Sequence, residues 1–161
     1  MKIKISLTIL SCMVVSMMPV VSYAHSDAHG KATGIVKERM DSMSDMGKAM
    51  KAMAKIVKGK ADFNLDVVRV SAQTLADHAS TITEKFPDTD ASRHNKESDA
   101  LPAIWTSGDQ FSELSTKLET AIAALQLAAK GDLDKRGLRM VFAKTGKACS
   151  ACHDDFRKPK E

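Results

Sequence analysis

Two cysteines and a histidine near the end of the chain have the types and the spacing of a cofactor attachment site. Cys149 and Cys152 lie three positions apart, and His153 follows directly in the stretch CSACH. Cys-x-x-Cys-His is the signature of covalent haem attachment, in which the two thiols add to the two vinyl groups. On a helix, His153 shares a face with Cys149, so its imidazole can bind the iron. The motif predicts one covalent haem c with His153 as the proximal iron ligand.

Three other interpretations of the cysteine pair explain less. A thioredoxin-like site needs the pair at the start of a helix after a strand, whereas a long helical pattern precedes Cys149. A zinc site needs more ligands, and the third cysteine, Cys12, lies in an apolar N-terminal segment. A helical binding module that uses the pair as a plain disulfide stays an alternative, although it leaves His153 without a role.

The N-terminal segment has the pattern of a secretory signal peptide. Residues 1–24 combine two early lysines with an apolar run and end on a small-x-small sequence. Pro19 interrupts the run, which argues against a membrane anchor. We expect cleavage to leave residues 25–161 as a single domain without a membrane span, located in the periplasm. Two cysteines in an oxidising compartment must pair, bind a group or react, which agrees with haem attachment.

Four stretches of the remaining chain carry apolar residues at helical spacing, with steps of three and four. They begin at Val36, Leu65, Ile104 and near Asp132, and they end before Gly59, Pro87, Gly131 and Pro159. No alternating strand pattern accompanies them. The pattern predicts an all-α fold, an antiparallel four-helix bundle with a longer polar loop from Pro87 to Leu101. The apolar faces are rich in Ala, Gly and Met, which leaves room for a cofactor in the bundle.

With the attachment motif at the end of a four-helix pattern, the sequence resembles the class II c-type cytochromes, the cytochrome c′ family. The resemblance covers residues 25–161. It rests on CSACHDDFR, on LPAIW before the third helix, and on KERMDSM and KGK in the first helix. It implies an up-and-down bundle with one covalent haem near one end, a periplasmic location, and often a homodimer through the first two helices.

The resemblance also suggests a sixth ligand for the iron. In this family the residue at the sixth position commonly falls one turn after an arginine of the first helix. Here Met43 follows Arg39 by four residues and precedes Lys58-Gly59 by fifteen, which resembles the low-spin, methionine-ligated branch. Met43 is therefore the expected sixth ligand, with Met40 and Met46 as fallbacks. A methionine stripe at helical spacing is also ordinary core filler.

Arginines and lysines supply the remaining candidates. Arg39 is expected either to contact a haem propionate, which an arginine can bind through two nitrogens, or to be an ordinary surface cation. The resemblance implies that Arg157 helps to shape the pocket around the proximal ligand. A cluster of cations near the attachment site is expected to steer an acidic redox partner; its members are Lys144, Lys147, Arg157, Lys158 and Lys160.

The function predicted from the sequence is the transfer of one electron. Ligation by His153 and Met43 would fill both axial positions of the iron, so no catalysed reaction is expected. The predicted partners are redox proteins of the periplasm. A formal net charge of +4, with cations spread among the acids, excludes an ordinary nucleic-acid-binding protein. The alternative is a five-coordinate, high-spin family member that binds nitric oxide or carbon monoxide.

Overall fold

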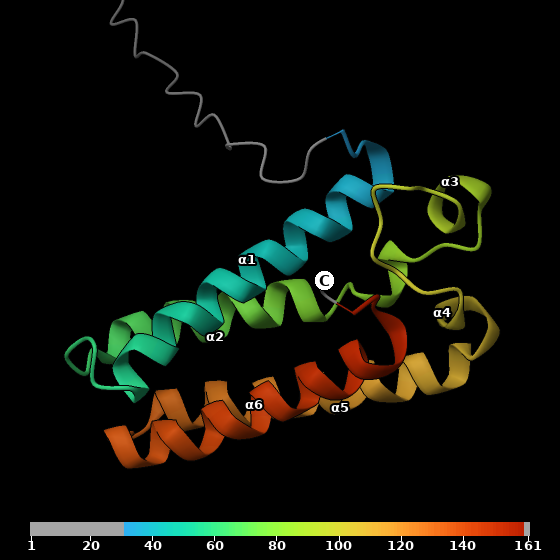
Figure 1. Cartoon of the computed structure of the whole chain (residues 1–161). Helices are drawn as coiled ribbons and strands as arrows, with labels where there is room; N and C mark the ends of the chain where they lie inside the picture. Colours follow the sequence, from blue (N-terminus) through green and yellow to red (C-terminus); the bar gives the residue numbers. More distant parts are fainter. Residues whose placement is uncertain (1–30, 160–161) are drawn as a thin grey trace, which may run out of the picture.

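The computed structural model describes residues 31–159, and these residues form a helical domain (Figure 1). Its order is α1 (Gly34–Val57), α2 (Leu65–Ala79), η1, a 3-10 turn (Thr83–Lys85), α3 (Asp90–Arg93), α4 (Ala103–Thr106), α5 (Gly108–Lys130) and α6 (Lys135–Phe156). Extended pairing within the described residues is limited to one isolated bridge between Ala100 and Arg157.

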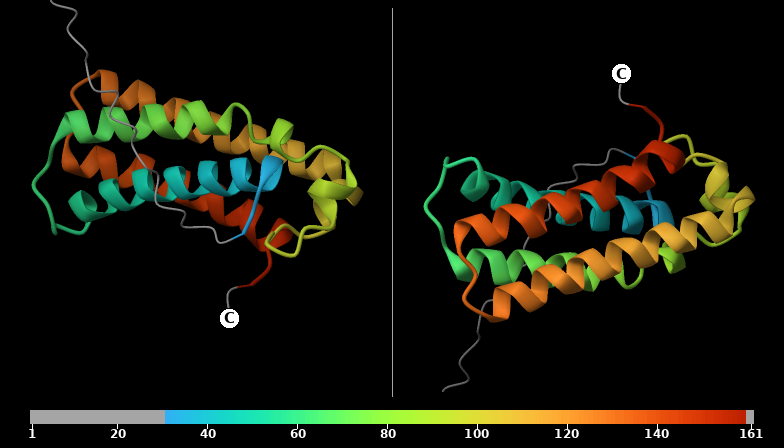
Figure 2. Two further views of the ribbon diagram at one scale, coloured as in Figure 1. Left: turned by 90° about the horizontal axis from the view of Figure 1, so that it is seen from above. Right: turned by 90° about the horizontal axis from the view of Figure 1, so that it is seen from below.

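The four long helices form an antiparallel bundle. Helix α1 packs on α2, α2 on α5, and α5 on α6, while α6 closes the ring against α1. Figure 2 shows the turn between α1 and α2 at one end of the bundle and the short helices α3 and α4 at the other. This arrangement confirms the predicted all-α four-helix bundle.

Local sequence signals end α1 and begin α6 where the pattern predicts. Lys58 caps α1, and Gly59 adopts a φ of +70°, a left-handed conformation that favours glycine. The amide of Lys60 then donates to the carbonyl of Lys55 at 2.8 Å, which closes a Schellman motif. At the start of α6, Oδ1 of Asp134 accepts a hydrogen bond from the amide of Gly137 at 2.7 Å.

Two predicted helix boundaries are wrong. The second helix ends at Ala79 rather than beside Pro87, because Ser80 and Thr81 donate their hydroxyls to the carbonyls of Asp77 and His78 and so compete with further helix. The third helix is broken in two, since the backbone of Ser107, with a φ of −127° and a ψ of 47°, is not helical between α4 and α5.

The apolar core fills the bundle along its length. Its most deeply buried large side chains come from all four long helices: Met53, Ile56, Val68, Leu75, Ile122, Leu125 and Leu138. No helix among the described residues is both long and apolar enough to cross a membrane. The predicted signal peptide, residues 1–24, lies outside the described residues.

Candidate haem site

A cavity of about 590 Å³ opens near the end of the bundle that holds the short helices, between α1 and α6. Its volume lies within the range of small-molecule and cofactor sites, about 300–1,000 Å³. All six predicted site residues line this one cavity: Arg39, Met43, Cys149, Cys152, His153 and Arg157. The fold thus brings together residues that are more than one hundred positions apart in the chain.

Helix α6 supplies the reactive side of the cavity. Cys149 and Cys152 are half-buried free thiols, and His153 is exposed at the cavity lining. Burial raises the pKa of Cys149. Burial, helped by the charges of Cys149 and Asp155, raises the pKa of Cys152 to about 11. Neither cysteine has the lowered pKa that activates the thiol of a redox enzyme.

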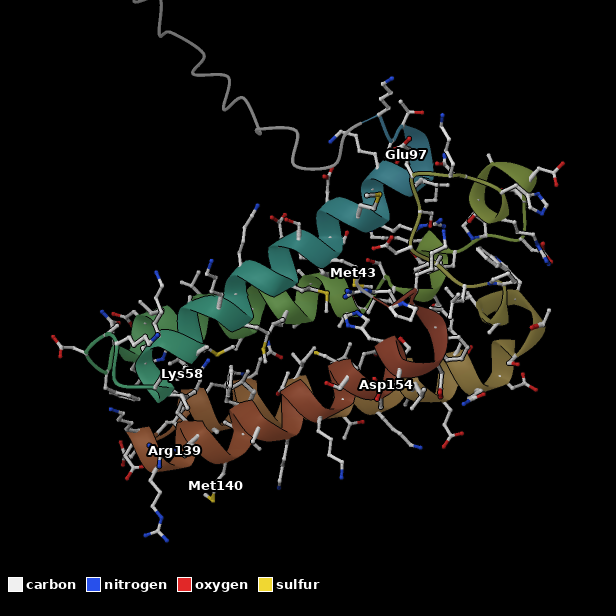
Figure 3. The ribbon with its side chains drawn as sticks, viewed as in Figure 1. Met43, Lys58, Glu97, Arg139, Met140 and Asp154 are labelled. Atoms are coloured by element: carbon white, nitrogen blue, oxygen red, sulfur yellow. The ribbon has the colours of Figure 1, made fainter. Side chains whose placement is uncertain are left out.

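Helix α1 supplies an opposing side rich in thioethers. Four methionines of this helix line the cavity: Met40, Met43, Met46 and Met50. Figure 3 places Met43 between α1 and the C-terminal half of α6. Met46 is buried with 6% exposure, whereas the other three are half-buried. Met50 is a cavity residue that the sequence reasoning missed, although it continues the same helical stripe. Which methionine, if any, binds iron stays a prediction.

Arg39 is a buried cation in the cavity lining, with only 3% of its surface exposed. Its Nη1 donates to Oγ of Ser92 at 2.9 Å, and its Nη2 donates to the Ser92 carbonyl at 2.9 Å and to Oγ of Ser98 at 2.6 Å. The guanidinium carbon lies 4.8 Å from the ring centre of Phe86. Burial lowers the pKa of Arg39. It is therefore not an ordinary surface cation.

The long loop before α5 joins Arg39 to the end of α6. Oγ of Ser98 also accepts from the amide of Ala100 at 3.1 Å. The amide of Leu101 donates to the carbonyl of Phe156 at 2.9 Å, and the amide of Lys158 donates to the carbonyl of Asp99 at 2.8 Å. The loop thus ties the α1 side of the cavity to the segment that follows His153. The sequence predicted a longer polar loop here but not the role of its serines.

Aromatic side chains close the inner part of the cavity. The rings of Phe86, Phe111 and Phe156 all line it, and Phe111 meets Phe86 and Phe156 edge-on at centroid distances of 5.1 and 5.2 Å. These three were part of helical stripes in the sequence and were not predicted as site residues. Trp105 stays outside the lining, and its Nε1 donates to the carbonyls of Phe86 and Pro87.

The donor set of the cavity fits a covalently held haem. Two free thiols and an imidazole lie on one side, and apolar side chains supply most of the remaining lining. Arg39 makes no ion pair with a carboxylate among the described residues, so an anionic group of a bound cofactor can supply its counter-charge. A metal site made of protein ligands alone is not indicated, because no group of three or more His, Cys, Asp or Glu side chains comes together in the described part of the chain.

Comparisons with known proteins agree with this geometry. The sequence model of the family described as Cytochrome C′ matches residues 34–157. Cytochrome c′ of Rhodopseudomonas palustris is 33% identical over 128 residues, which cover 80% of this chain and 84% of the relative. A crystal structure of a variant of cytochrome c′ from the same organism superimposes with a TM-score of 0.71 and 30% identity, and covers 80% of this chain and 100% of that one.

Three solved structures of variants of cytochrome c′ from Alcaligenes xylosoxidans are nitric oxide complexes. One of these variants is 26% identical to this chain. The two structures superimpose with a TM-score of 0.69, and the match covers 78% of this chain and 94% of the relative.

Proposed function

Because this chain belongs to the cytochrome c′ family, and therefore carries a covalently attached haem c, we propose that it binds nitric oxide or carbon monoxide. When bound, the haem would supply a redox-active iron that can take a gas as a ligand. Cys149 and Cys152 would hold the haem through thioether bonds, and His153 would be the proximal ligand of the iron.

The main support for this proposal is the composition of the cavity lining. Besides His153 and the two attaching cysteines, the part of the lining that the structure describes offers only methionine thioethers as common ligands of haem iron. Among residues 31–159, the α1 side holds no imidazole, carboxylate or phenol that would bind ferric iron strongly. A small neutral gas can enter such an apolar space, and the relative solved with nitric oxide supports the same ligand class.

The other residues of the cavity would orient the haem and exclude water. Arg39 and Arg157 lie in the lining with cationic groups that suit the propionates. Phe86, Phe111 and Phe156 form an apolar cluster that keeps water from the inner edge. Export through residues 1–24 to the periplasm is part of the same proposal, since haem attachment and two otherwise unpaired cysteines suit that compartment.

A second candidate is the one-electron carrier with His153 and a methionine as axial ligands. The observation that favours it is the set of four methionines in the lining, with Met43 one turn after Arg39. A thioether is a soft ligand that stabilises ferrous iron and raises the reduction potential. In that case the iron would be six-coordinate and the partners would be redox proteins.

Absorption and resonance Raman spectra of the purified haem protein separate the two candidates. The gas-binding function requires a five-coordinate, high-spin iron that takes up carbon monoxide when ferrous and nitric oxide in both oxidation states. A low-spin spectrum with a methionine signature, and no uptake of either gas, would replace it with electron transfer. A purified protein without covalent haem would overturn both.

A further inference from the structure

Two acid-free stretches of the chain carry ten exposed cations. Residues 46–61 contain five lysines and no Asp or Glu, and residues 135–153 contain five Lys or Arg and again no acid. All ten side chains are exposed. We call them the α1–α6 basic face: Lys48, Lys51, Lys55, Lys58, Lys60, Lys135, Arg136, Arg139, Lys144 and Lys147.

The two stretches are neighbours in space, because α1 and α6 pack on each other. A β-carbon placed on Gly59 lies 3.6 Å from Nζ of Lys135, and one placed on Gly146 lies 3.8 Å from Cε of Met50. Figure 3 shows Lys58 on α1 and Arg139 on α6 at the same end of the bundle. At 1.5 Å per residue, the stretch in α6 extends over about 27 Å.

This charge is uncompensated on its own face and contrasts with the rest of the domain. Of the ten cations, only Lys48 forms an ion pair with a described carboxylate, that of Asp45 at 2.8 Å. Residues 62–134, which include α2 and α5, hold thirteen Asp and Glu against six Lys and Arg. The domain therefore has a basic side, made by α1 and α6, and an acidic remainder, so the expectation that the cations are spread evenly among the acids is wrong.

We propose that the α1–α6 basic face binds the surface of an anionic lipid bilayer. Eight of its ten cations are lysines, a residue depleted from specific protein interfaces, and the aromatic side chains that anchor such interfaces are absent from its exposed residues. Met140, with 60% exposure, is its one large exposed apolar side chain. A bilayer requires no shape complementarity and attracts each Lys or Arg near its surface.

This inference goes beyond the proposed function, because it holds whether or not the sixth iron position is open. It is tested by co-sedimentation of the intact haem protein with vesicles at low salt. One set of vesicles contains equal parts of phosphatidylglycerol and phosphatidylcholine, and the other contains phosphatidylcholine alone. We expect binding to the first set only, and release when the salt concentration is raised.

Charge reversal on the basic face and elsewhere gives a matched pair of variants. The test variant carries Lys51→Glu, Lys55→Glu and Arg139→Glu, and the control carries Lys96→Glu, Lys117→Glu and Lys130→Glu, all at exposed positions. Both variants lose the same net charge. Since each lost Lys or Arg weakens binding roughly fivefold, the test variant should bind at least about a hundredfold more weakly than wild type. The control should stay within about fivefold.

Three results would overturn the proposal. The first is no binding of wild-type protein to the anionic vesicles at low salt. The second is an equal loss of binding in both variants, which would indicate a response to net charge alone. The third is self-association, in which the basic face of one molecule binds the acidic surface of a second copy. Sedimentation equilibrium at the same low salt detects that association, and the haem absorption of each variant verifies that the bundle is intact.

Discussion

The α6 side and the α1 side of the cavity differ in how many residues could perform each role. On α6, two thiols and an imidazole fall within five consecutive residues, 149–153, and none of them can be replaced by a neighbour of the same type. On α1, four methionines line the cavity between residues 40 and 50. We therefore expect the α6 side to determine whether a haem is held at all, and the α1 side to determine what else reaches the iron.

The largest effect is expected from removing the attachment chemistry of α6. The double variant Cys149→Ser, Cys152→Ser cannot form thioether bonds, so haem should be lost when the protein is denatured, and the purified chain should have the mass of the bare polypeptide. Because the haem fills space between α1 and α6 in the folded bundle, its loss should also lower the unfolding temperature. Haem staining of a denaturing gel measures the loss of haem, and mass spectrometry measures the mass of the chain.

The control for this variant is Ser150→Ala, an exposed position between the two cysteines. It should keep the covalent haem. A double variant that still stains for haem after denaturation would show that the attachment site lies elsewhere.

The α6 side was predictable from the sequence because its chemistry is local. Cys149, Cys152 and His153 are adjacent in the chain, and a helix places them together whatever the rest of the fold does. The four long helices were predictable for a similar reason, since apolar periodicity and Gly or Pro stop signals act within a single element.

The rest of the site depends on contacts between distant segments. The hydrogen bonds of Arg39 to Ser92 and Ser98 cross more than fifty residues, and the sequence marks neither serine. Without them Arg39 could equally be a surface cation. The choice among the methionines of α1 is open for a related reason, because helical spacing places several of them on the same side of the helix.

The second prediction concerns the ligand space on α1. Met43→Ala should open room in the cavity and raise the affinity of the ferrous protein for carbon monoxide about tenfold, or about 1.4 kcal/mol. Met40→Ala and Met50→Ala, at other half-buried positions of the same lining, are the matched controls and should change the affinity less. Optical titration with the gas measures all three.

Spectra of the same variants test whether a methionine of α1 binds the iron and electron transfer is the function. If wild-type protein is low-spin and Met43→Ala makes it high-spin with a lower reduction potential, then Met43 is the sixth ligand and electron transfer becomes the function. If only Met40→Ala or Met46→Ala has that effect, the ligand is that neighbour.

The third prediction contrasts two methionines of α1. Met53 is fully buried in the core and does not line the cavity, whereas Met43 does. Met53→Ala should lower the free energy of unfolding by about 2–5 kcal/mol through lost packing, with an unchanged haem spectrum. Denaturant unfolding and absorption spectra measure the two effects. A spectral change in Met53→Ala would mean that this core position also influences the haem.

The smallest effect is expected where the two sides of the cavity are tied together. Oγ of Ser98 accepts hydrogen bonds from Nη2 of Arg39 at 2.6 Å and from the amide of Ala100 at 3.1 Å, and Ala100 forms the bridge to Arg157. Ser98→Ala leaves both donors short of a partner, so it should lower the free energy of unfolding by about 1–3 kcal/mol. The control Ser112→Ala, at an exposed position, should change the free energy of unfolding by less than about 0.5 kcal/mol.

The position of Ser98 between the two sides of the cavity allows a second measurement on Ser98→Ala. Because Ser98 connects α1 to the segment after His153, its loss should loosen the α1 side while the covalent bonds of α6 keep the haem in place. Hydrogen exchange should therefore rise in the loop of residues 87–101 and in the first turns of α1, with no rise around Cys149 and Cys152. Faster exchange along α6 as well would mean that the loop supports both sides equally, and the contrast between them would then rest on the cysteines and His153 alone.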